Sequence, residues 1–494
     1  MLYQSTRDAS AKKVTASLAI KQGLADDGGL FVPEVIPSLS QDEILSLCKD
    51  SYPQRAAKIL AKFLSDYTYE ELLEDCEKAY APTSFLGGCA PLKKVHNGLY
   101  SLELWHGPTS AFKDMALQIM PRLLSRALVK NNEERTALIL VATSGDTGKA
   151  ALEGYRDIDR IKIMVFYPVD GVSRVQKLQM ATQGGDNVNV CAIRGNFDDA
   201  QSGVKAIFSD HAAAERLDQS GIFLSSANSI NWGRLAPQIV YYVSAYCDLL
   251  TEGSIKLGDK VNFCVPTGNF GNILAAYIAK KMGLPIDKLI CASNTNNVLT
   301  DFLRTGEYNR NRQFHLTMSP SMDILISSNL ERLLWLTAGS EVTATYMESL
   351  KNTGRYQITP EHLAAINETF VGYYADETAT AKTIHKTFVD DKYLSDTHTA
   401  VALSAAEQYA AESGDSKITV VASTASPYKF AADVLCSLGG EKPSDDLDSL
   451  ALLSEKTGTD ITLPLRGLAE RKVRFDKVID AADMANEVFS YIEQ

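Results

Sequence analysis

Lys113 is the residue best placed for covalent chemistry, because of what surrounds it. The segment LWHGPTSAFK ends on this lysine, and residues 114–129 form an amphipathic stretch that predicts a helix. An amine at the start of a helix lies at the positive end of the helix dipole, which disfavours the ammonium form. The neighbouring Ala111 and Phe112 predict an apolar wall that lowers the pKa of the amine further. A neutral amine can attack an aldehyde and hold it as a Schiff base, whereas an isolated lysine at a helix start is usually a surface charge.

The loop TSGDTG follows a predicted strand and precedes a predicted helix, which is where anions bind in α/β proteins. Two glycines let backbone N–H groups approach the anion, and two hydroxyls add donors. A nucleotide P-loop is excluded by spacing, since only two residues separate Gly145 from Gly148 and Ala150 replaces the magnesium-binding hydroxyl. Asp146 is expected to order the loop or to accept from a cation. The carboxylate-sized anion site predicted here comprises Thr143, Ser144, Gly145, Asp146 and Thr147.

A second loop, GNFGN, also joins a predicted strand to a helix. Its backbone amides would form a short cup at a helix N-terminus that suits a phosphate monoester, although a structural glycine turn is the alternative. The residues of this cup are Gly268, Asn269, Phe270, Gly271 and Asn272.

A third loop, STASPYKF, ends an apolar predicted strand with hydroxyl groups. Thr424 could donate to a ring nitrogen, or the loop could simply cap a helix ahead of Pro427. A reactive lysine, a phosphate cup, a carboxylate-sized anion loop and a free hydroxyl together match an aldehyde cofactor with a phosphate tail and a pyridine nitrogen. That cofactor is pyridoxal 5'-phosphate.

The scaffold that must position these loops is predicted to be α/β. Apolar strand-like segments alternate with helical ones along most of the chain, as in parallel sheets covered on both faces. We expect two doubly wound lobes in residues 86–494 with the active site between them, preceded by a mainly helical N-terminal domain in residues 1–85. The segments predicted as strands are 98–105, 136–143, 162–168, 189–193, 221–226, 261–267, 288–293 and 419–424. One of the helices between them is expected over residues 198–217.

Composition excludes several classes of partner. The chain has 494 residues and a net charge of −12, which argues against binding to nucleic acid. It contains no apolar run long enough to cross a membrane and no signal-peptide pattern. Its eight cysteines are scattered without a CxxC pair, which is typical of a reducing cytoplasm, and its seven histidines show no paired spacing, so no metal site is expected.

Several long blocks resemble threonine synthases of the longer bacterial and fungal class, which are fold type II pyridoxal-phosphate enzymes of the tryptophan synthase β kind. The blocks run nearly end to end and include STRD…GLADDGGLFVPE, HGPTSAFKD, TSGDTG, SSANSINWGR, GNFGN, PSMDILISSNLERLL and DTHTAVA. The resemblance implies that Lys113 carries the cofactor, TSGDTG receives the substrate's α-carboxylate, GNFGN binds the cofactor phosphate and Thr424 faces the pyridine nitrogen. One departure is that many members have histidine where this chain has Ser426.

The resemblance implies conversion of O-phospho-L-homoserine and water to L-threonine and phosphate. The alternatives are a related pyridoxal-phosphate phospho-lyase, a serine/threonine dehydratase, or a binder of phosphorylated ligands without chemistry. Four basic residues lie near the candidate loops, and each is predicted to be a surface charge rather than a ligand of the substrate phosphate: Lys149, Arg174, Arg234 and Arg332. Oligomeric state and regulation are not indicated.

Overall fold

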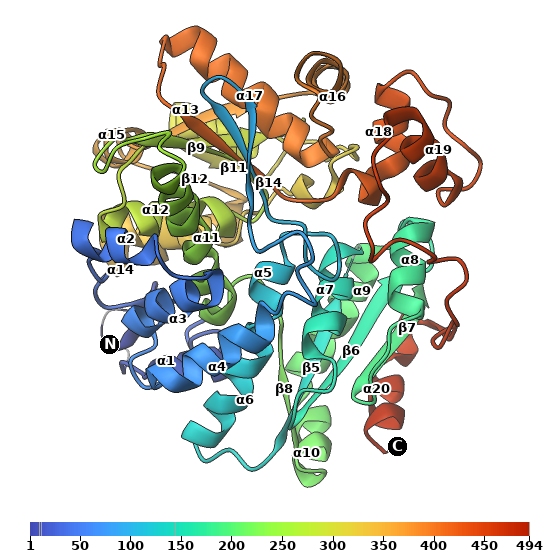
Figure 1. Ribbon diagram of the computed structural model, residues 1–494. Coiled ribbons are helices and arrows are strands. Elements are labelled where there is room, and N and C mark those ends of the chain that lie inside the picture. The colour runs from blue at the N-terminus through green and yellow to red at the C-terminus, as the bar shows by residue number, and fades with distance from the viewer. Residues whose placement is uncertain (9, 11, 144, 494) are drawn as a thin grey trace.

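The larger of the two main sheets has six strands and forms one lobe of the molecule (Figure 1). The computed structural model describes residues 1–8, 10, 12–143 and 145–493. All neighbouring strands of this sheet run parallel except the β3–β4 hairpin. In spatial order the strands are β13 (Phe370–Tyr374), β10 (Ile286–Ser293), β9 (Val261–Pro266), β14 (Thr419–Ser423), β4 (Leu99–Glu103) and β3 (Leu92–His96).

The smaller sheet has five strands, all parallel, and forms the second lobe. The central strands of both sheets are buried on both faces, which explains why they are continuously apolar in the sequence. In spatial order the strands are β15 (Val478–Asp480), β7 (Val188–Arg194), β6 (Ile161–Pro168), β5 (Thr136–Ala142) and β8 (Ile222–Ser225).

Helices connect the strands of both lobes. Those between β4 and β8 are α5 (Asp114–Leu117), α6 (Met120–Lys130), α7 (Asp146–Tyr155), α8 (Arg174–Ala181), α9 (Phe197–Ser209) and α10 (His211–Gln219). Those from β8 to β14 are α11 (Trp232–Thr251), α12 (Gly271–Met282), α13 (Val298–Thr305), the 3₁₀ turn η1 (Pro320–Met322), α14 (Leu330–Thr353), α15 (Pro360–Asn367), α16 (Glu377–Asp391) and α17 (Thr397–Ser413), with a small hairpin of β11 (Glu307–Asn309) and β12 (Arg355–Gln357). After β14 come η2 (Pro427–Phe430), α18 (Ala431–Ser437), α19 (Asp448–Thr457), η3 (Ala481–Asp483) and α20 (Met484–Ile492).

The predicted α/β fold class is confirmed, and each of the eight segments predicted as strands overlaps a strand. Two predicted helices are wrong in extent. The helix expected over 114–129 is divided into α5 and α6, because Pro121 has no N–H and disfavours a continuous helix through the preceding turn. The helix expected from 198 to 217 is divided at Asp210, whose side chain accepts from Ala212 N and Ala213 N and so begins a new helix.

The N-terminal region consists of four helices and a two-stranded antiparallel sheet, and it shares its core with the lobes. The buried indole of Trp232, in α11, contacts the rings of Tyr3 and Phe63 from the N-terminal region. Figure 1 shows these helices side by side with α6 and α11. The elements are β1 (Tyr3–Ser5), α1 (Ala16–Gln22), β2 (Phe31–Pro33), α2 (Gln41–Leu47), α3 (Tyr52–Phe63) and α4 (Tyr69–Ala79).

The end of the chain returns to the smaller lobe. Strand β15 pairs with β7, and α20 buries Met484, Val488 and Tyr491 in the apolar cluster that covers one face of this sheet. Figure 1 shows the red C-terminal helix beside the lower lobe, far from the C-terminal helices α18 and α19 that precede it. This return was not predicted from the sequence.

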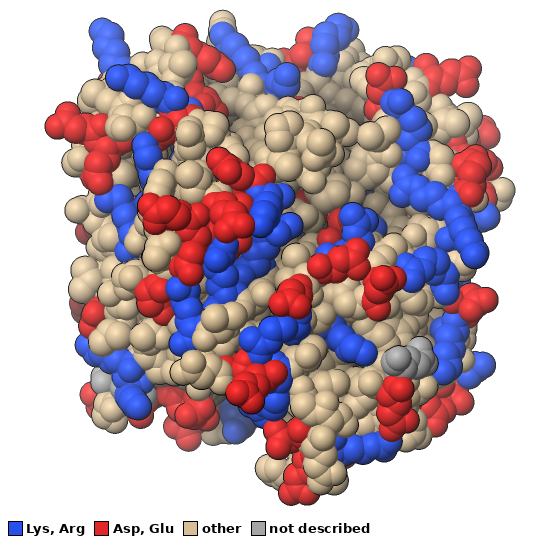
Figure 2. Space-filling view, turned by 60° about the horizontal axis from the view of Figure 1, so that its bottom comes forward, with Lys and Arg blue, Asp and Glu red and all other residues tan. Residues whose placement is uncertain are grey.

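The surface carries charges of both signs. Figure 2 shows acidic and basic side chains interspersed over the face that it presents. Among the helices that the structure describes, none combines the length and apolar character needed to cross a bilayer.

Helix α7 touches α5 at a glycine. A Cβ built on Gly154 would lie 1.9 Å from the backbone oxygen of Leu117, so only glycine allows this contact. Since α5 follows Lys113 directly and α7 follows the TSGDTG loop, the contact fixes the distance between two candidate loops.

We predict that Gly154→Ala lowers the free energy of unfolding by about 2 kcal/mol, because overpacking strain exceeds the gain in helix propensity. Urea denaturation would measure it. The matched control is Gly184→Ala, at a glycine with no heavy atom within 4 Å of a built Cβ, and it should change stability by less than about 0.5 kcal/mol. Equal effects of the two substitutions would contradict the role of the α5–α7 contact.

Candidate active site

The predicted site residues follow four strands, three of them neighbours in the larger sheet. Lys113 follows β4, the GNFGN loop follows β9, and Thr424 follows β14, which lies between those two strands. The TSGDTG loop follows β5 of the smaller sheet. Because loops at the carboxyl ends of parallel strands converge, this order brings the three loops of the larger lobe to one place.

The loop that carries Lys113 is held by the loop after β14. Phe112 N donates to Thr424 O over 2.8 Å, and Ser426 N donates to Ser110 O over 3.0 Å. Within the lysine loop, the buried carboxylate of Asp114 accepts from Thr109 N at 2.8 Å and from Thr109 Oγ1 at 2.7 Å. Lys113 therefore sits in a backbone that hydrogen bonds fix on both sides.

Burial lowers the pKa of Lys113 to about 8, and the nearby cations Lys429 and Arg234 act in the same direction, against the carboxylate of Asp146. The residue is half-buried rather than fully enclosed. Two causes that the sequence suggested for the lowered pKa of Lys113, the helix dipole and the ring of Phe112, are not supported. Helix α5 has four residues, so its dipole is weak, and the Phe112 ring lies 5.0 Å from Nζ in a contact that favours the ammonium.

The GNFGN loop offers a row of free backbone donors. Within the described residues the amides of 268–272 have no hydrogen-bond partner, and Phe270 adopts a left-handed conformation, with φ of 62°, as the N-cap of α12. Beside them, the Oδ1 atom of Asn272 accepts from Tyr241 at 2.6 Å and from Tyr242 at 2.5 Å. Its Nδ2 is buried without a partner among the described residues. The loop thus has the donors that a phosphate needs.

The TSGDTG loop is ordered by its own first residue. Thr143 Oγ1 accepts from Gly145 N at 3.0 Å and from Gly148 N at 2.9 Å, so these groups are engaged inside the loop rather than free for a ligand. Ser144 lies outside the described residues. The amides of Asp146 and Thr147, at the start of α7, have no partner in the described part of the chain and remain available to an anion.

Asp146 was expected either to order the loop or to accept from a cation, and the structure shows that it accepts from a cation. Its Oδ1 lies 2.8 Å from Nζ of Lys429, whose side chain is fully buried. Lys429 Nζ also donates to Thr109 O at 3.1 Å and to Gln179 Oε1 at 3.3 Å, so its donors are satisfied. Burial raises the pKa of Asp146, but Lys429 and Lys113 outweigh it and hold that pKa below its ordinary value.

In the loop after β14, the hydroxyls of Thr424 and Ser426 have different environments. Ser426, not Thr424, caps the following turn η2, by accepting from Tyr428 N at 3.3 Å. The Thr424 hydroxyl has no hydrogen-bond partner among the described residues, and the backbone of Thr424 is joined to Phe112, next to Lys113. Thr424 is thereby available to a ligand near the amine.

Of the four basic residues expected at the surface, only Arg174 is exposed. Lys149 is buried against Glu153 and Gln183, and Arg332 donates to the backbone oxygens of Phe31 and Ile230. Arg234 is buried as well, and it differs because its Nε has no partner within the described residues. The local sequence could not reveal that these basic side chains are buried. Their burial depends on oxygen atoms that accept hydrogen bonds from them and that belong to residues far away in the chain, such as Gln183 for Lys149 and Phe31 for Arg332.

Sequence reasoning also missed Lys429, Ser321 and His398. All three lie in quoted segments, STASPYKF, PSMDILISSNLERLL and DTHTAVA, but the local sequence does not indicate which distant residue each side chain contacts. In the described residues no group of three or more histidine, cysteine, aspartate or glutamate side chains could hold a metal ion.

The burial of Lys113 gives a testable pKa. In protein free of cofactor, Lys113 labelled by reductive methylation with ¹³C-formaldehyde should titrate near pH 8, with the neutral amine dominant above that pH and the ammonium below it. NMR would follow the resonance, and Lys113→Arg identifies it by its loss. A midpoint equal to that of exposed lysines would contradict the desolvation of this amine.

Three family models match consecutive parts of the chain. They are described as threonine synthase N terminus, over residues 2–80, pyridoxal-phosphate dependent enzyme, over residues 84–424, and threonine synthase C-terminal, over residues 399–488. The second model alone covers more than half of the chain.

Individual proteins agree with the family models. Threonine synthase of Saccharomyces cerevisiae is 38% identical over 89% of each chain. Human threonine synthase-like 1 is 39% identical over 98% of this chain, which spans only 66% of the human protein's length. The crystal structure of pyridoxal-phosphate-bound threonine synthase from Brucella melitensis has a TM-score of 0.88 and 36% identity, covering 100% of this chain and 98% of the other. The chain belongs to the threonine synthase family of pyridoxal-phosphate-dependent enzymes.

Proposed function

We propose that this protein is a threonine synthase, which converts O-phospho-L-homoserine and water to L-threonine and phosphate with pyridoxal 5'-phosphate bound at Lys113. The observation that carries the proposal is a half-buried lysine of lowered pKa whose neighbour Phe112 is hydrogen-bonded to Thr424, a residue whose hydroxyl has no partner among the described residues. The family relationship supports the same reaction.

The residues present fit the cofactor. Its aldehyde would react with Lys113, and its phosphate would lie on the amides of Gly268, Asn269, Phe270, Gly271 and Asn272. The unpartnered Nδ2 of Asn272 gives this cup one more donor, and its direction is set by the two tyrosine hydroxyls that occupy Oδ1. Thr424 would offer its hydroxyl to the pyridine nitrogen, and a neutral group there does not hold that nitrogen protonated as an aspartate would.

The substrate carries two anions, and the chain has donors for both. The N-terminus of α7, with the amides of Asp146 and Thr147, suits the α-carboxylate, and Ser144 belongs to the same loop. The side chain of Thr143 acts by ordering that loop. Arg234 suits the substrate phosphate, because its buried Nε lacks a partner among the described residues and its charge reaches Lys113.

When bound, the cofactor withdraws electrons from the substrate's α carbon, so that protons on neighbouring carbons become acidic. Lys113 would remove one proton from the α carbon and one from the β carbon, and protons would be returned to the α carbon and to the γ carbon that the phosphate has left, since one fixed amine reaches neighbouring carbons. Its pKa of about 8 lets it act as base and as acid near neutral pH. Phosphate would leave the γ carbon, and water would add at the β carbon.

The decisive measurement is product analysis with O-phospho-L-homoserine. The holoenzyme should release threonine and phosphate in equal amounts, and Lys113→Ala should fold but form neither. Release of 2-oxobutyrate would instead identify a phospho-lyase, and turnover of L-serine or L-threonine a dehydratase. Absence of any product, with the substrate bound, would identify a binder without catalysis. Each of these three results overturns the proposal.

Arg234→Gln tests the assignment of the substrate phosphate. Loss of one hydrogen bond to a charged group costs about 1.5–3 kcal/mol, so KM for O-phospho-L-homoserine should rise roughly 10- to 150-fold. The product should remain threonine, and cofactor affinity should stay within about twofold of the wild type. A loss of cofactor affinity with unchanged KM would place Arg234 at the cofactor instead. Lys149→Gln serves as the control for removing a buried cation nearby.

A further inference from the structure

His398 and Asp396 form a buried pair at the start of α17 that the proposed function does not use. His398 Nδ1 lies 2.9 Å from Asp396 Oδ1, and both residues are buried. The other partners of this carboxylate are also donors, because it caps α17 by accepting from His398 N at 2.8 Å and from Thr399 N at 3.3 Å. Because the Asp396 carboxylate is surrounded by donors, it is the acceptor in its hydrogen bond with His398. The hydrogen of that bond therefore lies on Nδ1 of His398.

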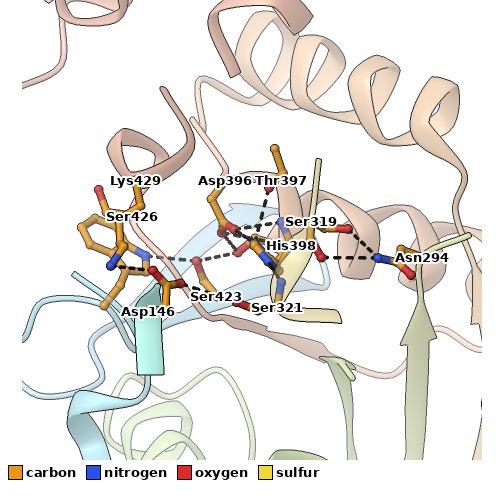
Figure 3. A network of polar contacts seen from close by, with 12 residues as sticks. Asp146, Asn294, Ser319, Ser321, Asp396, Thr397, His398, Ser423, Ser426 and Lys429 are labelled. Atoms are coloured by element: carbon orange, nitrogen blue, oxygen red, sulfur yellow. Dashed lines mark hydrogen bonds and ion pairs between the residues drawn. The ribbon is translucent and has the colours of Figure 1, made fainter. Parts of the chain in front are cut away.

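The other ring nitrogen faces η1. His398 Nε2 lies 3.1 Å from Ser321 N, a backbone N–H that can only donate, so Nε2 accepts. Figure 3 shows His398 between Asp396 on one side and Ser321 on the other. The imidazole is therefore held in one tautomer and one orientation, and it ties the start of α17 to the η1 segment.

Ser321 lies where the parts of the site meet. Its Oγ is 3.4 Å from Lys113 Nζ and 3.5 Å from Asp146 Oδ2. Its backbone oxygen would lie 2.9 Å from a Cβ built on Gly268, the first residue of the phosphate cup. These hydroxyl contacts are long, as is common for catalytic hydrogen bonds in a site without its ligands. Ser321 is exposed, whereas His398 is buried.

We propose that Asp396 and His398 are positioning residues that seat Ser321, and that the Ser321 hydroxyl is the partner of the Lys113 amine, accepting from it and donating to Asp146. The inference rests on the proposed function for the reactive role of Lys113. The proposal concerns the orientation of the Ser321 hydroxyl group. The carboxylate of Asp146 draws the hydroxyl hydrogen of Ser321 to itself, which turns the oxygen lone pairs toward the amine. A protonated Lys113 then has an acceptor that holds it in the cleft between proton transfers.

The first test measures the amine in protein without cofactor. Ser321→Ala should lower the titration midpoint of ¹³C-methylated Lys113 by about half a pH unit or more, because the ammonium loses an acceptor. Ser321→Thr, which keeps the hydroxyl, should restore it. The charged groups around Lys113 are Asp146, Lys429, Arg234 and Asp114, and none of them is changed.

The matched control is Ser319→Ala in the same segment, since Ser319 bonds to Asn294 Nδ2 at 3.0 Å rather than to the lysine (Figure 3). It should leave the midpoint unchanged. If Ser319→Ala and Ser321→Ala give the same midpoint, Ser321 is not the partner of the amine and the proposal is overturned.

The second test uses the holoenzyme. Ser321→Ala should lower kcat about tenfold with KM within about twofold, because the substrate's own contacts remain. His398→Ala should lower kcat in the same way, and His398→Gln should recover part of it, since an amide oxygen can accept from Ser321 N. A change in KM alone would overturn the positioning role.

The experiments distinguish a failure of the proposed reaction from a failure of the proposed contact between Ser321 and Lys113. A wild-type enzyme that makes no threonine while Ser321→Ala still shifts the Lys113 midpoint would overturn the reaction and leave the contact intact. Should His398→Ala not fold, the Ser321 and Ser319 variants still decide the question.

Discussion

The buried ion pair between Asp146 and Lys429 is the constraint on which the site depends. It joins the first residue of α7 in the smaller lobe to the loop after β14 in the larger lobe. Removing one member of such a pair leaves a buried charge uncompensated, which costs about 3–5 kcal/mol, so the two lobes cannot separate at this point without penalty. Lys429 also donates to Thr109, and this ties the lysine loop to the same cation.

The pair also sets the electrostatics of Lys113. Asp146 favours the ammonium form, whereas Lys429 and Arg234 oppose it, and burial has the largest effect. Because Lys429 is close to the same carboxylate, Asp146 is partly neutralised and its influence on Lys113 is moderated. If Asp146 had no cationic partner, its carboxylate would keep the Lys113 amine protonated and unreactive. If Asp146 were absent, the cationic forms of Lys113 and Lys429 would repel each other without a carboxylate between them. The reactive amine thus results from a balance among fixed charges on separate elements.

The sequence was sufficient for the features that repeat or that lie on loops with glycine. The apolar strands were predicted closely, because strands buried on both faces are continuously apolar. Lys113 was selected from its position at a helix start and the GNFGN loop from its place between a strand and a helix, and both elements are where they were expected, while their binding roles stay predictions. By contrast, the burial of Arg234 and Lys149 and the pairing of His398 with Ser321 depend on contacts between residues far apart in the chain, such as the 77 positions between Ser321 and His398. No local pattern records such a contact.

The return of the C-terminus to the smaller lobe has a consequence for how the molecule is made. Strand β7 is the edge of its sheet until β15 pairs with it, and the apolar face around Ile193 and Ala200 is covered by α20 only when the last residues are available. During synthesis the edge of β7 therefore stays unpaired while four strands of the larger sheet, β9, β10, β13 and β14, are translated. Such an edge is a template for pairing with another chain. This aggregation-prone interval ends only when residues 478–492 have been synthesised and have packed against the smaller lobe.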